Sequence, residues 1–221
     1  MEIISVNNIL KEERLNEPTL NALTGDANNY SVLLFQPQGK INATPEAVRN
    51  SDEGLARFQF SKFLEEAREQ QADLVVTPEY SMPWTVLREA ISDPSKGPAP
   101  GKLWALGCEG IKYSEIKGLR DSLKHHAKVI FEEMTADDGK FVDPLAYVFQ
   151  TTKKGNDEKT ILVMLIQFKT CAMADSYEFE KNRLQIGNSV YQFGKYHADI
   201  SLVSIICSDV FAFTDQIAQK V

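Results

Sequence analysis

The 221-residue sequence has few of the features that mark secreted or metal-stabilised proteins. It contains only three cysteines, Cys108, Cys171 and Cys207, which are widely spaced and form no Cys-x-x-Cys pair. An odd, scattered set of thiols argues against a disulfide framework and against a structural zinc site. We therefore expect a reducing, cytoplasmic environment. Each cysteine taken alone is more often a small buried hydrophobe than a nucleophile.

Long apolar runs are also missing. The longest, residues 161–166, has the length of a strand and falls far short of the roughly 18 to 20 apolar residues that cross a bilayer. Residues 1–4 lack the basic start and long apolar stretch of a secretory signal. The sequence thus predicts a protein that does not act in a membrane.

The sequence has fewer basic than acidic residues. There are 24 Lys and Arg against 31 Asp and Glu, which gives a net charge of −7 and a pI of about 5.1. This balance argues against nucleic acid or an anionic membrane as the partner. With 43% hydrophobic residues the chain can still bury a substantial core, in one domain or two. A local basic groove is compatible with this balance.

The hydrophobic pattern predicts an α/β fold. Short apolar runs predict strands at residues 30–35, 74–76, 103–106, 129–131, 147–149, 161–168, 190–193 and 202–206. Helical periodicity predicts helices at residues 56–67, 84–91 and 113–124. Strands that alternate with helices, followed by a hairpin, are typical of an α/β layered domain with a mixed sheet.

The domain organisation predicted from this pattern has two parts. Residues 1–29 form an irregular or partly helical N-terminal extension, and residues 30–221 form the main domain. Within that domain the strand at residues 30–35 is expected to be buried, and residues 40–54 are expected to be a loop.

Three reactive side chains follow predicted strands directly. Glu79 comes after the proline that stops the strand at 74–76, where α/β sheets place ligands. Lys169 follows the predicted strand at 161–168 directly, and Cys207 follows the predicted strand at 202–206. A helix could begin after Cys207, near Thr214. Backbone N–H groups at such a turn favour a thiolate and an oxyanion. The alternatives are a solvated glutamate, a snorkelling lysine and a structural thiol.

Taken together, these contexts resemble the nitrilase, or carbon–nitrogen hydrolase, family. Pro78-Glu79, Phe168-Lys169 and Ile206-Cys207-Ser208-Asp209 occur in the family's order, and the resemblance covers residues 30–215. The segment 180–187 also resembles the family stretch in which an acidic residue precedes a glycine. The resemblance therefore implies Glu180 as a supporting glutamate, with Glu178, or a merely exposed carboxylate, as the alternatives.

The resemblance implies a definite chemistry. Cys207 attacks an amide, carbamoyl or nitrile carbon, Glu79 is the general base, and a thioester forms. Lys169 stabilises the developing negative charge, helped by the backbone of Ser208. Glu180 orients Lys169 or tunes Glu79, and Asp209 is a further supporting residue. No metal or cofactor is expected.

The same resemblance implies an α-β-β-α sandwich that oligomerises. Two departures stand out: residues 170–173 lack the family's frequent His-Leu pair, and the chain ends only 14 residues after Cys207. We therefore expect a fragment truncated after the nucleophile elbow, part of a larger multidomain chain or a homo-oligomer. A catalytically silent nitrilase-like module for oligomerisation or ligand sensing is the alternative, and an unrelated α/β domain is a third possibility.

Overall fold

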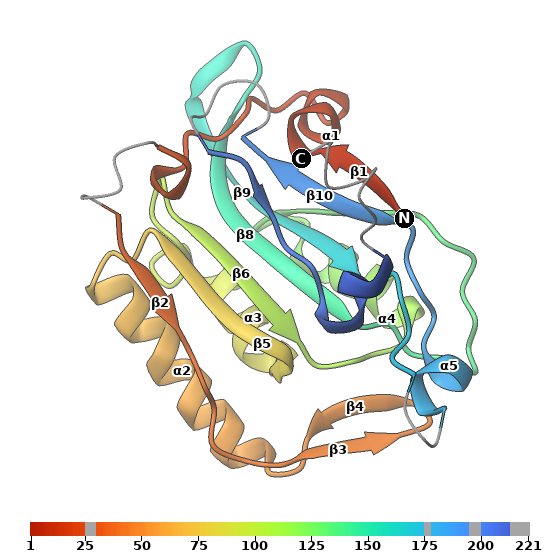
Figure 1. Ribbon diagram of the computed structural model, residues 1–221. Coiled ribbons are helices and arrows are strands. Elements are labelled where there is room, and N and C mark those ends of the chain that lie inside the picture. Colours follow the sequence, from red (N-terminus) through yellow and green to blue (C-terminus); the bar gives the residue numbers. More distant parts are fainter. Residues whose placement is uncertain (25–29, 175–177, 195–199, 213–221) are drawn as a thin grey trace.

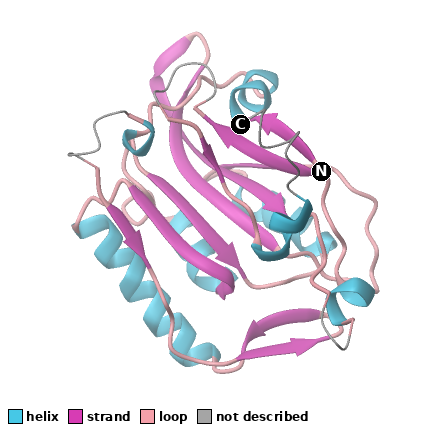
Figure 2. Ribbon diagram, in the orientation of Figure 1, coloured by secondary structure: helices cyan, strands magenta, loops and turns pink. Residues whose placement is uncertain are grey.

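The computed structural model describes residues 1–24, 30–174, 178–194 and 200–212 (Figure 1). These residues form an α/β fold in which a six-stranded sheet, of order β2-β5-β6-β8-β9-β7, lies between helices and a smaller sheet of order β1-β10-β11. Figure 2 shows the strands of the large sheet with helices behind them. No helix in the described part of the chain has the length and apolar character needed to cross a bilayer.

The large sheet consists of β2 (Val32–Leu34), β5 (Leu74–Met82), β6 (Leu103–Cys108), β7 (Lys128–Phe131), β8 (Pro144–Lys153) and β9 (Asn156–Phe168). The small sheet consists of β1 (Glu2–Ser5), β10 (Ser189–Phe193) and β11 (Leu202–Val203). The helices are α1 (Val6–Glu12), α2 (Glu53–Glu69), α3 (Trp84–Ser92), α4 (Tyr113–Leu123) and α5 (Phe179–Arg183).

The strand directions make the large sheet mixed, as the sequence predicts. Strand β5 is parallel to β2 and β6, whereas β8 is antiparallel to both β6 and β9. Side chains of successive residues point to opposite faces of a sheet. One row across the strands faces α2, α3 and α4, and it runs through Val75, Trp104, Val148, Met164 and Val129. Both faces of the central strands are therefore buried, which explains their continuous apolar sequences.

Helix α2 illustrates why the predicted helices are correct. Its buried residues recur at helical spacing, and they are Ala56, Phe60, Phe63, Leu64 and Ala67. The Asp52 side chain accepts a hydrogen bond from the N–H of Leu55 at 2.8 Å and so caps the first turn. Helices α3 and α4 likewise lie where periodicity predicts them.

The N-terminal segment is part of the packed structure. The expected partly helical character is correct for α1, but residues 2–5 form β1, which pairs in parallel with β10. Leu10, Leu15, Leu20 and Leu23 are buried in the same cluster as the small sheet. The prediction of irregular structure was wrong here because a four-residue strand depends on a partner that is distant in sequence.

Three further predictions are corrected by the structure. Residues 41–50 contain the hairpin β3 (Ile41–Thr44) and β4 (Ala47–Asn50), not a loop. Strand β2 is not buried, because it lies at the edge of the sheet, and Leu34 is 71% exposed. Of the predicted strand 202–206, only Leu202–Val203 forms a strand, and it pairs with β10. The helix expected near Thr214 lies outside the described residues.

An anchored carboxylate fixes the start of β5. Asp73 accepts hydrogen bonds from the Asn21 side chain (2.8 Å), the Ser31 N–H (2.7 Å) and the Lys102 ammonium (2.7 Å). Burial alone would raise the pKa of Asp73, but Lys102 and Ser31 outweigh it and lower the pKa from its ordinary 3.8 to about 2. Asp73 thus ties three segments together in its ionised form.

Replacing Asp73 by alanine is expected to lower the free energy of unfolding at pH 7 by about 1–2 kcal/mol, allowing for solvent screening. Because the folded pKa is depressed, this contribution is present above pH 3.8 and disappears as the pH falls toward 2. Urea unfolding of both proteins at pH 7 and at low pH measures it. Asp137→Ala, at an exposed position, is the control. Equal stability of wild type and Asp73→Ala at pH 7 would contradict the prediction.

Candidate active site

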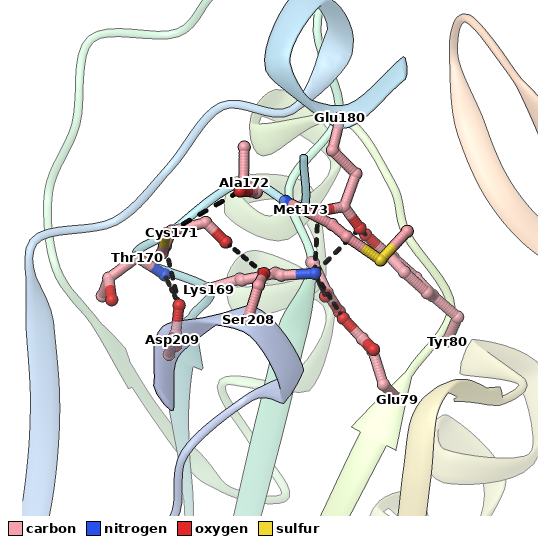
Figure 3. Close-up of polar contacts among 11 residues, drawn as sticks. Glu79, Tyr80, Lys169, Thr170, Cys171, Ala172, Met173, Glu180, Ser208 and Asp209 are labelled. Carbon is pink, nitrogen blue, oxygen red and sulfur yellow. Dashed lines mark hydrogen bonds and ion pairs between the residues drawn. The ribbon is translucent and has the colours of Figure 1, made fainter. Parts of the chain in front are cut away.

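Lys169 lies at the centre of a buried ionic cluster. It follows the last residue of β9, and its side chain is 0% exposed. Its Nζ donates hydrogen bonds to Glu79 Oε1 (2.7 Å) and Glu180 Oε1 (2.8 Å), and it lies 3.9 Å from Asp143 Oδ2 (Figure 3). Burial acts to lower the pKa of Lys169, but these hydrogen bonds outweigh it and raise the pKa above its ordinary value. The ammonium therefore remains charged, and the snorkelling alternative is excluded.

The backbone around Glu79 departs from regular strand geometry. The register of β5 against β6 shifts between Thr77 and Met82, and Tyr80 has a positive φ of 58°. The partner strand accommodates this only because position 107 is glycine, since a Cβ there would lie 2.2 Å from the Pro78 carbonyl oxygen. The bulge turns the Glu79 carboxylate toward Lys169.

Glu180 is the supporting carboxylate that reaches the cluster. It is 4% exposed, and besides Lys169 it accepts hydrogen bonds from Tyr80 Oη (2.7 Å) and the Met173 N–H (2.7 Å). Phe179 stacks on Phe141 and so fixes the short helix α5. Glu178, the alternative, pairs with the exposed Lys181 at 2.7 Å. The burial of Glu180 excludes the reading as an exposed carboxylate.

Cys207 occupies a sharp turn beside the cluster. It has a positive φ of 42° and begins a 3-10 helix, Cys207–Ala212. Together with Glu79 and Asp143 it lines a pocket of about 240 Å³. Burial raises the pKa of the Cys207 thiol, and the Glu79 charge raises it further, while Lys169 lowers it. The strained turn is of the kind found at functional sites.

The residues after Cys207 hold its turn against the segment that follows Lys169. Asp209 is fully buried, and its Oδ1 accepts hydrogen bonds from the N–H groups of Thr170 (2.8 Å) and Cys171 (2.7 Å). Ser208 Oγ donates to the Cys171 carbonyl at 2.7 Å. Asp209 therefore connects the lysine and cysteine segments (Figure 3). An oxyanion role for the Ser208 backbone stays a prediction.

Asp143 belongs to the cluster and was missed by the sequence analysis. It precedes β8, and it is 1% exposed. An Asp-Pro pair ahead of an apolar run is typical of a turn, so nothing in the sequence pointed to a buried acid. Only the pairing of β8 with β9 brings it next to Lys169, whose N–H donates to the Asp143 carbonyl at 3.0 Å.

The three carboxylates also have the spacing of a metal site. One oxygen each of Glu79, Asp143 and Glu180 lie within 4.8 Å of one another. The Lys169 ammonium lies against all three and supplies the positive charge that a cation would otherwise bring. The cluster is therefore explained as a lysine held by acids, without a metal ion.

Comparison with known proteins gives only distant likeness. The sequence matches no protein-family model and no curated protein. Among solved structures the chain is similar to the glutamine-dependent NAD+ synthetase from Acinetobacter baumannii in complex with ADP, with 14% sequence identity and a TM-score of 0.40. The match covers 75% of this chain and 26% of the synthetase chain, so this chain spans about a quarter of that protein. The fold and the site themselves define an α/β protein with a cysteine beside a buried carboxylate–ammonium cluster.

Proposed function

We propose that the chain is a nitrilase-like carbon–nitrogen hydrolase domain that cleaves a non-peptide amide, carbamoyl or nitrile bond through a cysteine thioester. One observation carries the proposal: Glu79 both accepts a hydrogen bond from the buried Lys169 and shares a pocket with Cys207. Burying an ammonium among carboxylates is costly and adds little net stability. Such a cluster beside a thiol therefore favours a chemical role.

In the proposed first step Glu79 is the base. The raised pKa of Cys207 keeps the thiol neutral at pH 7, so its proton passes to Glu79 as the sulfur–carbon bond forms. For an amide, the carbonyl π electrons move to the oxygen, where Lys169 stabilises the negative charge. Glu180 keeps the ammonium in place through its 2.8 Å hydrogen bond.

The remaining steps return the site to its starting state. Glu79 gives its proton to the leaving nitrogen as the carbon–nitrogen bond breaks, which leaves a thioester on Cys207. Glu79 then takes a proton from water, and the hydroxide equivalent attacks the thioester carbon. The acid departs and Cys207 recovers its proton. No cofactor takes part in this scheme, and the partner is a small amide or nitrile.

A silent nitrilase-like module, used for oligomerisation or ligand sensing in a larger protein, is the second candidate. The observation that favours it is the raised pKa of Cys207, because a resting thiol is a weak nucleophile. In this case Glu79, Lys169 and Glu180 would only stabilise the fold.

Alkylation of the folded protein with iodoacetamide at pH 7, mapped by peptide mass spectrometry, separates the two. We expect Cys207 to react at least about 10-fold faster than Cys171, and Glu79→Gln to slow it by about 10-fold or more because the base is lost. In a silent module, Glu79→Gln would instead speed the reaction, since loss of the negative charge lowers the thiol pKa. Glu178→Gln, on the surface, is the matched control.

A further inference from the structure

The proposed mechanism assigns no role to one buried acid, Asp143. Among the described residues no hydrogen-bond donor reaches either carboxyl oxygen of Asp143. Its cationic neighbour Lys169 Nζ lies 3.9 Å away and directs its short hydrogen bonds to Glu79 and Glu180. An ionised carboxylate in such a place would be neither solvated nor hydrogen-bonded, which is costly.

The charges of the cluster show where a proton must be. Glu79, Asp143 and Glu180 would carry three negative charges against the single charge of Lys169. Glu180 accepts hydrogen bonds from Lys169, Tyr80 and the Met173 N–H. Glu79 accepts from Lys169. Asp143 has no donor, so it is the carboxyl that retains a proton.

We propose that Asp143 is protonated at neutral pH and donates its O–H to the Glu79 carboxylate, which makes it the positioning residue of the proposed base. The closest oxygens of Glu79 and Asp143 lie within 4.8 Å of each other. Two carboxylates cannot hydrogen-bond unless one of them holds a proton, and this resolves the lack of partners around Asp143. The inference rests on the proposed function, in which Glu79 takes the thiol proton.

The surroundings of Asp143 support this protonation. Burial and the neighbouring Glu79 charge raise the pKa of Asp143 well above its ordinary value, and Glu180 adds to this, while Lys169 opposes it. The titratable and charged groups near it are Glu79 and Tyr80 from β5, Cys108 from β6, Lys169 after β9 and Glu180 from α5, and Cys207 shares its pocket. Only Lys169 among them is cationic.

Protonation of Asp143 has a consequence for the thiol. It keeps the net charge of the cluster at −1 rather than −2. Negative charge near Cys207 raises its pKa, so ionising Asp143 would hold the thiol proton more tightly. Because rising pH also increases the thiolate fraction, we expect the alkylation rate of Cys207 in the wild type to rise less steeply with pH than it would beside a group that cannot ionise.

Two variants of nearly equal shape test the role. Asp143→Asn retains a neutral donor to Glu79, whereas Asp143→Leu has none. We expect Asp143→Asn to alkylate at Cys207 within about 3-fold of wild type at pH 7, and its rate should rise more steeply with pH than that of the wild type. Asp143→Leu should react about 10-fold or more slowly. Equal losses in both variants, with the same pH dependence in Asp143→Asn as in the wild type, would show an ionised counter-charge to Lys169 and overturn the inference.

The infrared spectrum of the folded protein at pH 7 tests the protonation of Asp143 without turnover or a reactive thiol. It compares only the wild type with Asp143→Asn, so it can be made even if Asp143→Leu does not fold. The wild type should show the carbonyl stretch of a protonated carboxylic acid, and Asp143→Asn should lack that band. Absence of the band from the wild type overturns the inference whether or not Cys207 is reactive. A band together with slow, unselective alkylation supports the protonated Asp143 and contradicts only the hydrolase.

Discussion

Replacing Lys169 by methionine is expected to lower the free energy of unfolding by about 3–5 kcal/mol, because it leaves buried carboxylates without their counter-charge. Methionine matches the length of the lysine stem, so packing changes little. Glu79 and Glu180 would lose hydrogen bonds of 2.7 and 2.8 Å to the ammonium. Urea unfolding at pH 7, followed by circular dichroism, measures the change.

Two further variants make this result specific. Lys181→Met removes an exposed lysine that pairs with Glu178, and its stability should stay close to wild type. Adding Glu180→Gln to Lys169→Met should restore part of the lost stability, since it removes one of the stranded charges. If Lys169→Met unfolds at the wild-type urea concentration, the cluster is not an ion-paired core.

Replacing Cys207 by alanine is expected to abolish hydrolysis, by on the order of 10⁴-fold or more, while the fold is kept. Cys207 is exposed and lies in a turn, so its side chain contributes little to the core. Ammonia release from a panel of small primary amides, carbamoyl compounds and nitriles measures the loss. Intact mass spectrometry should show an acyl adduct on the wild type that the variant lacks.

Cys171→Ala is the matched control for this experiment. Cys171 contacts Asp209 and Ser208 through its backbone N–H and carbonyl, which alanine retains, so both activity and adduct should persist. Equal turnover in Cys207→Ala and wild type, or an adduct on Cys171, would exclude Cys207 as the nucleophile.

The sequence predicts best those elements whose side chains are buried on a periodic face. Helix α2 and the pair β8–β9 carry strong apolar patterns, and both lie where expected. Strands β3 and β4 were missed because they are four residues long and carry polar side chains such as Asn42 and Arg49. Their pairing depends on the rest of the fold, including the hydrogen bond from the Gly110 N–H to the Val48 carbonyl.

The candidate site shows the same division. Glu79, Lys169 and Cys207 were selected because their motifs resemble a known family's in order. The structure brings Glu79 into contact with Lys169 and into one pocket with Cys207. The resemblance favoured Glu180 over Glu178, and the structure places Glu180 against Lys169 and pairs Glu178 with the exposed Lys181. Asp143 could not be predicted from the sequence, because its place in the cluster depends on the strand order, in which β8 lies between β6 and β9.

The parallel pairing of β1 with β10 constrains how this chain acquires its structure during synthesis. Glu2 pairs with Ser189 and Ser5 with Gln192, so β1 leaves the ribosome well before its partner β10. Meanwhile the face of β8 and β9 that later packs on the small sheet, with Tyr147, Phe149 and Leu165, stays uncovered. Non-local contacts of this kind slow folding and prolong the exposure of apolar surface to chaperones and to aggregation.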